Sequence, residues 1–420
     1  MTTAPKVVVI GAGVLGLSTA LELVNRGVTD VHVIERSHPG EGSSGRSVGM
    51  VETQYFRADD VEARVYGRRF YDRMAADHGL GFVACGYLRL GSTTDDIASF
   101  EGSVATQRQF GVDDAKVLTV EEISHRWPQL VTADRIGGLY GESDGYIDGY
   151  EYCTLAARMI KAAGATISTN CDLLGVVTGA DGTWKVVTST ETFVADVVVN
   201  AAGAWGAIAG ERLGAPVALH PQLHGAVTVD LRTPMEPLLP FVMDYVPDSG
   251  TDGVYFRAER ANQLIAGLHT DEGVHEAVSP DVRLRRVSED DVERVLTLMA
   301  ERLNVADDLA VSGSWQGIYP MSPDHRPIVG RHPEQPKVIC ALGAGGSGIQ
   351  LAPAIGLVAA EAVLDSVPTF DWSSAWAPDR VTAGIPSRPI VLKDHHDHAQ
   401  LRQHVAQPRT RRTLRASARD

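Results

Sequence analysis

The sequence predicts an α/β protein with two lobes, one around a parallel sheet and one around an antiparallel sheet. At the N-terminus, residues 6–36 combine an apolar strand, a glycine-rich turn, a helix and a second apolar strand. In the middle of the chain, short segments alternate apolar and polar residues, as strands of an antiparallel sheet do. The chain has 420 residues and 44% hydrophobic content, which suffices for two or three domains or one two-lobed unit.

The opening unit predicts a dinucleotide site. We expect a strand at Val7–Ile10, a helix at Val14–Asn25 and a strand at Val31–Ile34, followed by an acidic residue, Glu35. The turn has the GxGxxG pattern, and its residues are Gly11, Ala12, Gly13, Val14, Leu15 and Gly16. This order of strand, glycine turn, helix, strand and acid is typical of dinucleotide binding.

Each part of that unit has a physical reason. Gly11 permits the tight turn, Gly13 lets the backbone approach a pyrophosphate, and Gly16 lets the helix pack on the strand. The helix N-terminus offers N–H groups and partial positive charge to phosphates. Glu35 can accept hydrogen bonds from ribose hydroxyls but would repel a 2′-phosphate. NADP is therefore disfavoured, while FAD and NAD both remain open.

Further elements follow from periodicity and capping residues. Thr119, with acidic residues at 121 and 122, marks the start of one helix. We predict helices at 60–78, 97–110, 118–127, 154–163 and 289–303, and strands at 86–91, 166–168, 172–178, 184–188, 194–200, 224–230, 254–257 and 263–268.

Composition excludes several classes of function. The net charge of −15 argues against a nucleic-acid partner. Four cysteines, far apart and without a CxxC pair, indicate reduced thiols in a cytoplasmic protein and no metal site. We expect no membrane span, because no apolar run looks long enough. Residues 384–420 are rich in Pro, His and Arg and are predicted to be a disordered tail.

Four motifs in order resemble the D-amino acid oxidase superfamily, whose members include sarcosine oxidases, glycine oxidase and dimethylglycine dehydrogenase. The first is the opening turn with the Gly- and Ser-rich loop that follows Glu35, in which Ser43 and Ser44 can donate to phosphate and Arg46 can neutralise charge. The other three are Val197–Trp205, Gly317–Gly330 and Leu342–Gly356.

The resemblance implies FAD, held by a Rossmann-like lobe assembled from residues 1–85, 144–215 and 316–380. It implies a substrate lobe with an antiparallel sheet from residues 86–143 and 216–315. Besides the opening turn and Glu35, the cofactor-binding residues that it implies are Arg36, Ser43, Ser44, Arg46, Ser47, Val176, Ala202, Gly203, Trp205, Gly317, Gly343, Gly345, Gly346, Ser347, Gly348, Ile349 and Gln350.

The resemblance also bears on how the flavin is held. A helix beginning near Gly348 would place its positive end at the flavin edge that gains negative charge on reduction. Gly317 stands where monomeric sarcosine oxidases carry a cysteine, and Arg46 stands where dimethylglycine dehydrogenase-like enzymes use a histidine. Neither covalent link is available, so we expect non-covalent FAD.

The substrate anchors depart from the pattern of these relatives. Glu52 and Gln350 replace an Arg and a Lys of sarcosine-type enzymes, and Tyr319 replaces an Arg of glycine oxidase. Either Arg46, Arg257 or another arginine holds a substrate carboxylate, or the substrate has none near the reacting carbon. Alternatively, Glu52 points away from the cavity. If Glu52 lines the pocket, we expect it to attract a second cationic group.

His269 matches a histidine of the family's active-site region and can position or deprotonate an amine. Ile265 replaces the lysine that activates oxygen in sarcosine oxidases, so oxidase and dehydrogenase both stay open. We expect oxidation of a small-molecule amine or amino acid, with Glu52, His269, Tyr319 and Gln350 at the site. The alternative is a non-catalytic, assembly-type FAD protein of the same superfamily. The sequence does not indicate an oligomeric state.

Overall fold

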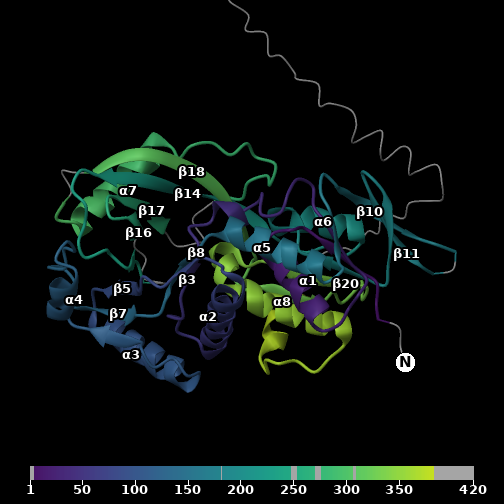
Figure 1. Cartoon of the computed structure of the whole chain (residues 1–420), viewed down its shortest axis with the longest axis horizontal. Helices are drawn as coiled ribbons and strands as arrows, with labels where there is room; N and C mark the ends of the chain where they lie inside the picture. The colour runs from purple at the N-terminus through teal and green to yellow at the C-terminus, as the bar shows by residue number, and fades with distance from the viewer. Residues whose placement is uncertain (1–3, 181, 247–252, 270–275, 306–308, 383–420) are drawn as a thin grey trace, which may run out of the picture.

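The computed structural model describes residues 4–180, 182–246, 253–269, 276–305 and 309–382. Figure 1 shows two groups of elements side by side. One holds the helices α1 (Val14–Asn25), α5 (Gly149–Ala162) and α8 (Gly348–Leu364), and the other holds α3 (Thr94–Gln109), α4 (Val120–Arg126) and α7 (Glu289–Arg302). The tail predicted at 384–420 lies outside the described residues. The two-lobed α/β prediction is confirmed by the sheets described below.

The first group is built on a six-stranded sheet in the order β19-β20-β13-β1-β2-β9. Five of its strands are parallel, and β19 runs antiparallel at one edge. The strands are β1 (Val7–Ile10), β2 (Val31–Ile34), β9 (Thr166–Ser168), β13 (Val197–Asn200), β19 (Ile328–Arg331) and β20 (Val338–Leu342). Because β1 is central, the turn that follows it opens at the carboxyl edge of the sheet, where α/β proteins bind ligands.

Helices α1 (Val14–Asn25), α5 (Gly149–Ala162) and α8 (Gly348–Leu364) pack together in this group (Figure 1). By length and composition alone, the segment Gly345–Leu364 could cross a membrane. We did not expect such a segment from the sequence. However, 78% of its apolar window is buried inside the protein, where α8 packs against α1. Core burial accounts for this composition.

Two small sheets flank the first group. One has the order β10-β11-β12 and the other β3-β8-β4. The strands are β3 (Met50–Val51), β4 (Phe82–Val83), β8 (Gly145–Ile147), β10 (Leu173–Thr178), β11 (Trp184–Thr188) and β12 (Thr192–Ala195). The single strand predicted at 194–200 is wrong, because the chain leaves β12 after Ala195 and enters β13 in the parallel sheet at Val197.

The second group is built on an eight-stranded sheet in the order β18-β14-β17-β16-β15-β5-β7-β6. Its strands are β5 (Tyr87–Gly91), β6 (Lys116–Leu118), β7 (Gly137–Gly141), β14 (His220–Leu231), β15 (Phe241–Asp244), β16 (Gly253–Arg260), β17 (Gln263–His269) and β18 (Leu309–Met321). All neighbours are antiparallel except β5 and β15. The lobe boundary predicted between residues 315 and 316 falls inside β18.

The remaining helices are α2 (Ala58–His78), α3 (Thr94–Gln109), α4 (Val120–Arg126), α6 (Gly206–Leu213), α7 (Glu289–Arg302) and α9 (Asp379–Thr382). The cap predicted at Thr119 is confirmed: its hydroxyl accepts a hydrogen bond from the Glu122 amide, and the Glu122 carboxylate accepts one from the Thr119 amide. One face of the large sheet packs on α4 and α7, which leaves the other face for the first group.

Candidate functional site

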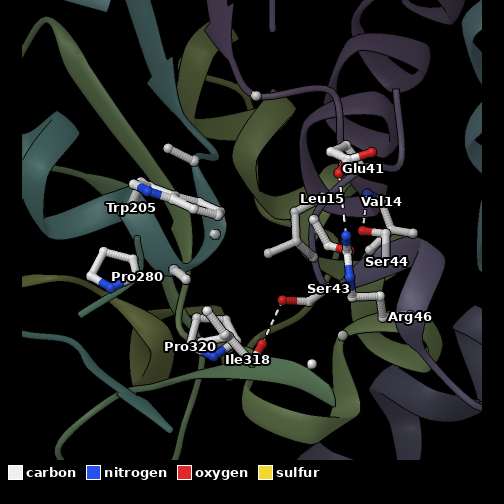
Figure 2. Close-up of a pocket in the computed structure, with 18 of the residues that line it drawn as sticks. Val14, Leu15, Glu41, Ser43, Ser44, Arg46, Trp205, Pro280, Ile318 and Pro320 are labelled. Carbon is white, nitrogen blue, oxygen red and sulfur yellow. Dashed lines mark hydrogen bonds and ion pairs between the residues drawn. The ribbon is translucent and has the colours of Figure 1, made fainter. Parts of the chain in front are cut away.

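A cavity of about 660 Å³ runs between the two groups of elements. Its wall is formed by the turn after β1, the loop after β2, the turn after β13, strands β14, β16 and β18, the segment 276–288 and the start of α8. Figure 2 shows Trp205 and Pro280 on one side and Val14, Ser44 and Arg46 on the other. The volume lies in the range of cofactor and small-molecule sites.

The opening turn is shaped by close backbone approach. A Cβ at Gly16 would lie 2.0 Å from the Gly11 carbonyl oxygen, so only glycine lets α1 start this near the strand. Gly11 has a φ of +103°, and a Cβ there would lie 2.6 Å from the Ala201 carbonyl oxygen. The N-terminus of α1 therefore faces the cavity directly, which favours a phosphate.

The carboxylate of Glu35 is fixed at the end of β2. It accepts hydrogen bonds from the amides of Ala12, at 2.8 Å, and Ser37, at 2.9 Å. Glu35 is half-buried and lines the cavity. Because each carboxylate oxygen has two lone pairs, the group can still accept hydrogen bonds from sugar hydroxyls.

The loop after β2 is tied to both walls of the cavity (Figure 2). The Ser44 hydroxyl accepts a hydrogen bond from the Val14 amide at 3.0 Å. The Ser43 hydroxyl donates to the Ile318 carbonyl on β18. The Arg46 guanidinium donates to the Gly42 carbonyl at 2.9 Å and pairs with Glu41 at 3.2 Å. These contacts hold the loop as one wall of the site.

One end of the cavity is closed by three residues that are distant in sequence. The Arg36 guanidinium lies 4.5 Å from the centre of the Trp205 ring. Trp205 Nε1 donates to the Asp281 carboxylate at 2.8 Å, and Arg36 pairs with the same carboxylate at 3.4 Å. Asp281 belongs to the segment 276–288, whose residues Pro280, Asp281, Val282 and Leu284 line the cavity. No sequence motif marks this segment.

The other end lies at the start of α8. There the rings of His224 on β14 and Tyr319 on β18 stack with centroids 3.8 Å apart. Tyr255 on β16 also lines the cavity, and burial raises the pKa of its hydroxyl well above the ordinary value. A tyrosine in this state remains a hydrogen-bond donor.

Most of the predicted cofactor residues line this cavity. They are Gly11, Gly13, Val14, Leu15, Glu35, Arg36, Ser43, Ser44, Arg46, Ser47, Ala202, Gly203, Trp205, Gly317, Gly345, Gly346, Gly348 and Ile349, and Tyr319 lines it as well. The residues Ala12, Gly16, Val176, Gly343, Ser347 and Gln350 lie outside its lining. Val176 packs against the core of the β10 sheet, although its neighbours Leu173 and Leu174 line the cavity.

Glu52 and Gln350 are fully buried beside the cavity but do not line it. The Glu52 amide donates to Gln350 Oε1 at 3.3 Å, and Glu52 Oε1 lies 3.5 Å from Arg64 Nε. Arg64, on α2, also donates to the Ser347 hydroxyl at 3.1 Å and lies 3.3 Å over the Tyr55 ring. The cationic group that lies beside Glu52 is therefore a side chain of this protein, Arg64.

His269 ends β17 on the face of the large sheet turned toward the first group. Its ring lies edge-on to Tyr245, with centroids 4.4 Å apart. His269 is outside the lining of the cavity, but its sheet partner Gly253 stands two residues before Tyr255. The structure therefore places His269 on the face of the sheet that carries Tyr255.

The comparisons with known proteins decide the family. Residues 6–362 match the model of the DAO family, FAD dependent oxidoreductase. The chain belongs to this family. It is 26% identical to glycine oxidase of Geobacillus kaustophilus over 380 residues, 88% of this chain and 96% of that protein. It is also 26% identical over 382 residues to human mitochondrial dimethylglycine dehydrogenase, but spans only 43% of that protein and 87% of itself.

Solved structures agree with the family assignment. L-proline dehydrogenase from P. horikoshii has a TM-score of 0.80 and 25% identity over 90% of this chain and 98% of that one. The protein is thus an FAD-dependent oxidoreductase of the DAO family. The residues that line the cavity fit FAD. The N–H groups of the α1 N-terminus would hold the pyrophosphate, the Glu35 carboxylate would accept hydrogen bonds from the ribose, and Arg36 with Trp205 would cover the adenine. The flavin ring would then lie at the α8 end.

Proposed function

We propose that this protein oxidises an amine or amino acid at the carbon next to nitrogen. The observation that carries the proposal is the cavity, whose FAD cradle ends at the α8 N-terminus beside Tyr255, Tyr319 and His224. Support comes from relatives named glycine oxidase, sarcosine dehydrogenase and 4-methylaminobutanoate oxidase, each 26% identical to this chain.

FAD, when bound, supplies the acceptor for the hydride of the C–H bond beside nitrogen. The chain's own groups prepare that step. The N-terminus of α8 directs positive dipole charge and backbone N–H groups toward the cavity end. The hydroxyl of Tyr255 offers a hydrogen-bond donor, and His269 is our candidate for taking the proton of an ammonium substrate. The imine product hydrolyses to a carbonyl compound and ammonia or a smaller amine.

The test is anaerobic addition of a panel of amines and amino acids to the yellow holoprotein. Bleaching of the long-wavelength flavin band by at least one of them supports the proposal, and repeating the assay in air identifies whether oxygen reoxidises the flavin. If no member of the panel bleaches the flavin and the protein instead co-purifies with a defined protein partner, the assembly-type alternative replaces it.

We also propose that the FAD is not covalently bound. Position 317 is glycine and position 46 is arginine, so neither carries the cysteine or histidine that forms the link in the relatives. Among the described residues, the atom nearest to a Cβ at position 317 would be the Cβ of Arg46, at 3.6 Å. Acid precipitation should leave the flavin absorbance in the supernatant. A yellow pellet after washing would contradict this.

A further inference from the structure

Helix α2 packs on the first turn of α8 (Figure 1). Arg64 and Tyr71 are seven residues apart, so they lie on one face of α2. The Arg64 guanidinium donates to the Ser347 hydroxyl at 3.1 Å, and the Tyr71 hydroxyl donates to the Ile349 carbonyl at 2.7 Å. Between them, a Cβ at Gly67 would lie 2.1 Å from a backbone carbonyl oxygen of α8. This face of α2 therefore holds the start of α8 in place.

The turn that α2 holds carries the groups that we expect to face the flavin. Gly346, Gly348 and Ile349 line the cavity, and Ser347 stands between the two glycines. The N-terminus of α8 offers backbone N–H groups and positive dipole charge at this end. A charge held against this turn therefore lies near the flavin end, although its side chain does not line the cavity.

Glu52 and Arg64 form a buried pair of opposite charges behind this turn. Their side chains are 0% and 2% exposed, and Glu52 Oε1 lies 3.5 Å from Arg64 Nε. Among the described residues, neither of these two atoms has a hydrogen-bond partner. The Glu52 amide donates to Gln350 Oε1 at 3.3 Å. Both residues are thus attached to the start of α8, Arg64 through Ser347 and Glu52 through Gln350.

Two further carboxyl groups lie near this pair. Asp60, one turn before Arg64 on α2, lies 3.4 Å from the guanidinium and is 21% exposed. Asp144 is buried, and burial, reinforced by the charge of Glu52, raises its pKa well above the ordinary value. This shift favours the neutral form of Asp144. Water screens the charge of Asp60 more than those of Glu52 and Arg64.

Buried charges of this kind act strongly on a redox group. When FAD takes up two electrons and one proton, it gains one negative charge, so a nearby cation favours the reduced form and a nearby anion the oxidised form. Inside a protein this influence exceeds that in water, because the effective dielectric constant is about 20 and not about 80. Since the two charges of the pair act in opposite directions, removing either one should change the flavin more than removing both.

We propose that Glu52 and Arg64 set the reduction potential of the FAD from behind the start of α8. The Arg64 guanidinium stabilises the reduced flavin, and the Glu52 carboxylate limits this effect. The inference goes beyond the proposed amine oxidation, because it gives both residues a function toward the cofactor and none in binding a substrate.

The test equilibrates each holoprotein with a redox dye of similar potential during slow anaerobic reduction by xanthine and xanthine oxidase. The ratio of reduced to oxidised flavin is read when the dye is half reduced. Glu52→Gln should raise this ratio about three- to tenfold, and Arg64→Met should lower it by a similar factor. A tenfold change corresponds to about 30 mV for a two-electron couple.

Two further variants separate charge from structure. The double variant Glu52→Gln/Arg64→Met removes both charges, and Arg64→Lys keeps the cation, so each should lie within about twofold of the wild type. Arg68→Met is the control, because it breaks a more exposed pair with Asp72 on the same helix, and it should change the ratio less than about twofold.

The measurement needs no amine, so its outcome is independent of the proposed reaction. If Arg64→Met does not retain FAD, the sign of the Glu52→Gln shift and the ratio of Arg64→Lys decide the question. The proposal is overturned if Glu52→Gln leaves the ratio unchanged or lowers it. It is also overturned if both single variants shift the ratio in the same direction, as a loosened α8 would, or if Arg68→Met shifts it equally.

Discussion

The indole of Trp205 donates a hydrogen bond to the carboxylate of Asp281 at 2.8 Å at one end of the cofactor cavity. Arg36, which lies over the same indole, pairs with the same carboxylate. The contact joins the turn after β13 to the segment 276–288, and both line the cavity. Because these residues lie near Glu35, we expect them to contact the adenosine half of FAD.

We predict that Asp281→Ala weakens FAD binding roughly fivefold, because it removes the hydrogen bond from Trp205 and the ion pair with Arg36 at an exposed position. FMN, which lacks the adenosine half, should bind equally to the variant and the wild type. Fluorescence titration of the apoprotein with each flavin measures both affinities. Asp290→Ala on the exposed side of α7 is the control, and equal loss for FMN and FAD would refute an adenosine-specific role.

Gly16 gives a prediction about the opening turn. Gly16→Ala should lower stability and FAD content, because its Cβ would lie 2.0 Å from the Gly11 carbonyl oxygen and force α1 away from β1. A backbone displacement of this kind costs about 1–3 kcal/mol or more. Thermal denaturation and the flavin-to-protein absorbance ratio measure the two effects. Gly102→Ala on α3 has no atom near its Cβ and should be neutral or mildly stabilising.

The sequence predicted the opening unit to the residue, and it predicted β5, β14, β16 and β17 of the second group but not β6, β7, β15 or β18. Val7–Ile10, Val14–Asn25 and Val31–Ile34 match the structure because local periodicity and glycines define both ends. Strand β18 was missed because glycine and proline interrupt its pattern, and its 13 residues are held by pairing with β14. Local patterns do not encode such distant partners.

In the candidate site, too, the features that depend on local sequence were predicted and those that depend on distant partners were not. Motifs marked the glycine turns and the loop after β2, whose functions depend on local backbone shape. Asp281 contacts Trp205, which is 76 residues away in the sequence, and Arg64 contacts Glu52 from another element. Neither contact is indicated by a local sequence pattern. Because Glu52 stands where sarcosine-type relatives have an arginine, the sequence indicated a change at this position. Its partner, Arg64, could be identified only from the structure, in which α2 packs beside Glu52.

An ion-pair network at the end of β15, an interior strand of the large sheet, gives a pH prediction. Arg302 on α7 donates to Asp134 at 2.6 and 2.7 Å and also pairs with Asp244, which Arg135 contacts at 2.8 Å. The hydrogen bonds from Arg302 hold the pKa of Asp134 below its ordinary value. Asp134 therefore stabilises the fold above its unfolded-state pKa of about 3.9, and this contribution is lost as the pH falls through the lower folded-state pKa.

Arg302→Ala should lower the free energy of unfolding by about 3 kcal/mol, because Arg302 is nearly buried and Asp244 retains only Arg135. The variant should also lose less stability than the wild type between pH 5 and about 3. Thermal denaturation across this range tests both. A parallel acid-induced loss in the two proteins would show that Asp134 does not depend on Arg302.

The buried pair of Glu52 and Arg64 gives the last prediction. Arg64→Met leaves the Glu52 carboxylate buried without its cation, which should cost about 3–5 kcal/mol. Adding Glu52→Gln removes the unpaired charge, so the double variant should be more stable than Arg64→Met alone. Chemical denaturation of the three proteins gives a coupling energy, expected at about 1–3 kcal/mol. Arg68→Met breaks a more exposed pair with Asp72 on the same helix and should cost less than about 1 kcal/mol. Additive losses in the double variant would mean that Glu52 and Arg64 do not stabilise each other, and the charge of Glu52 would then need another partner.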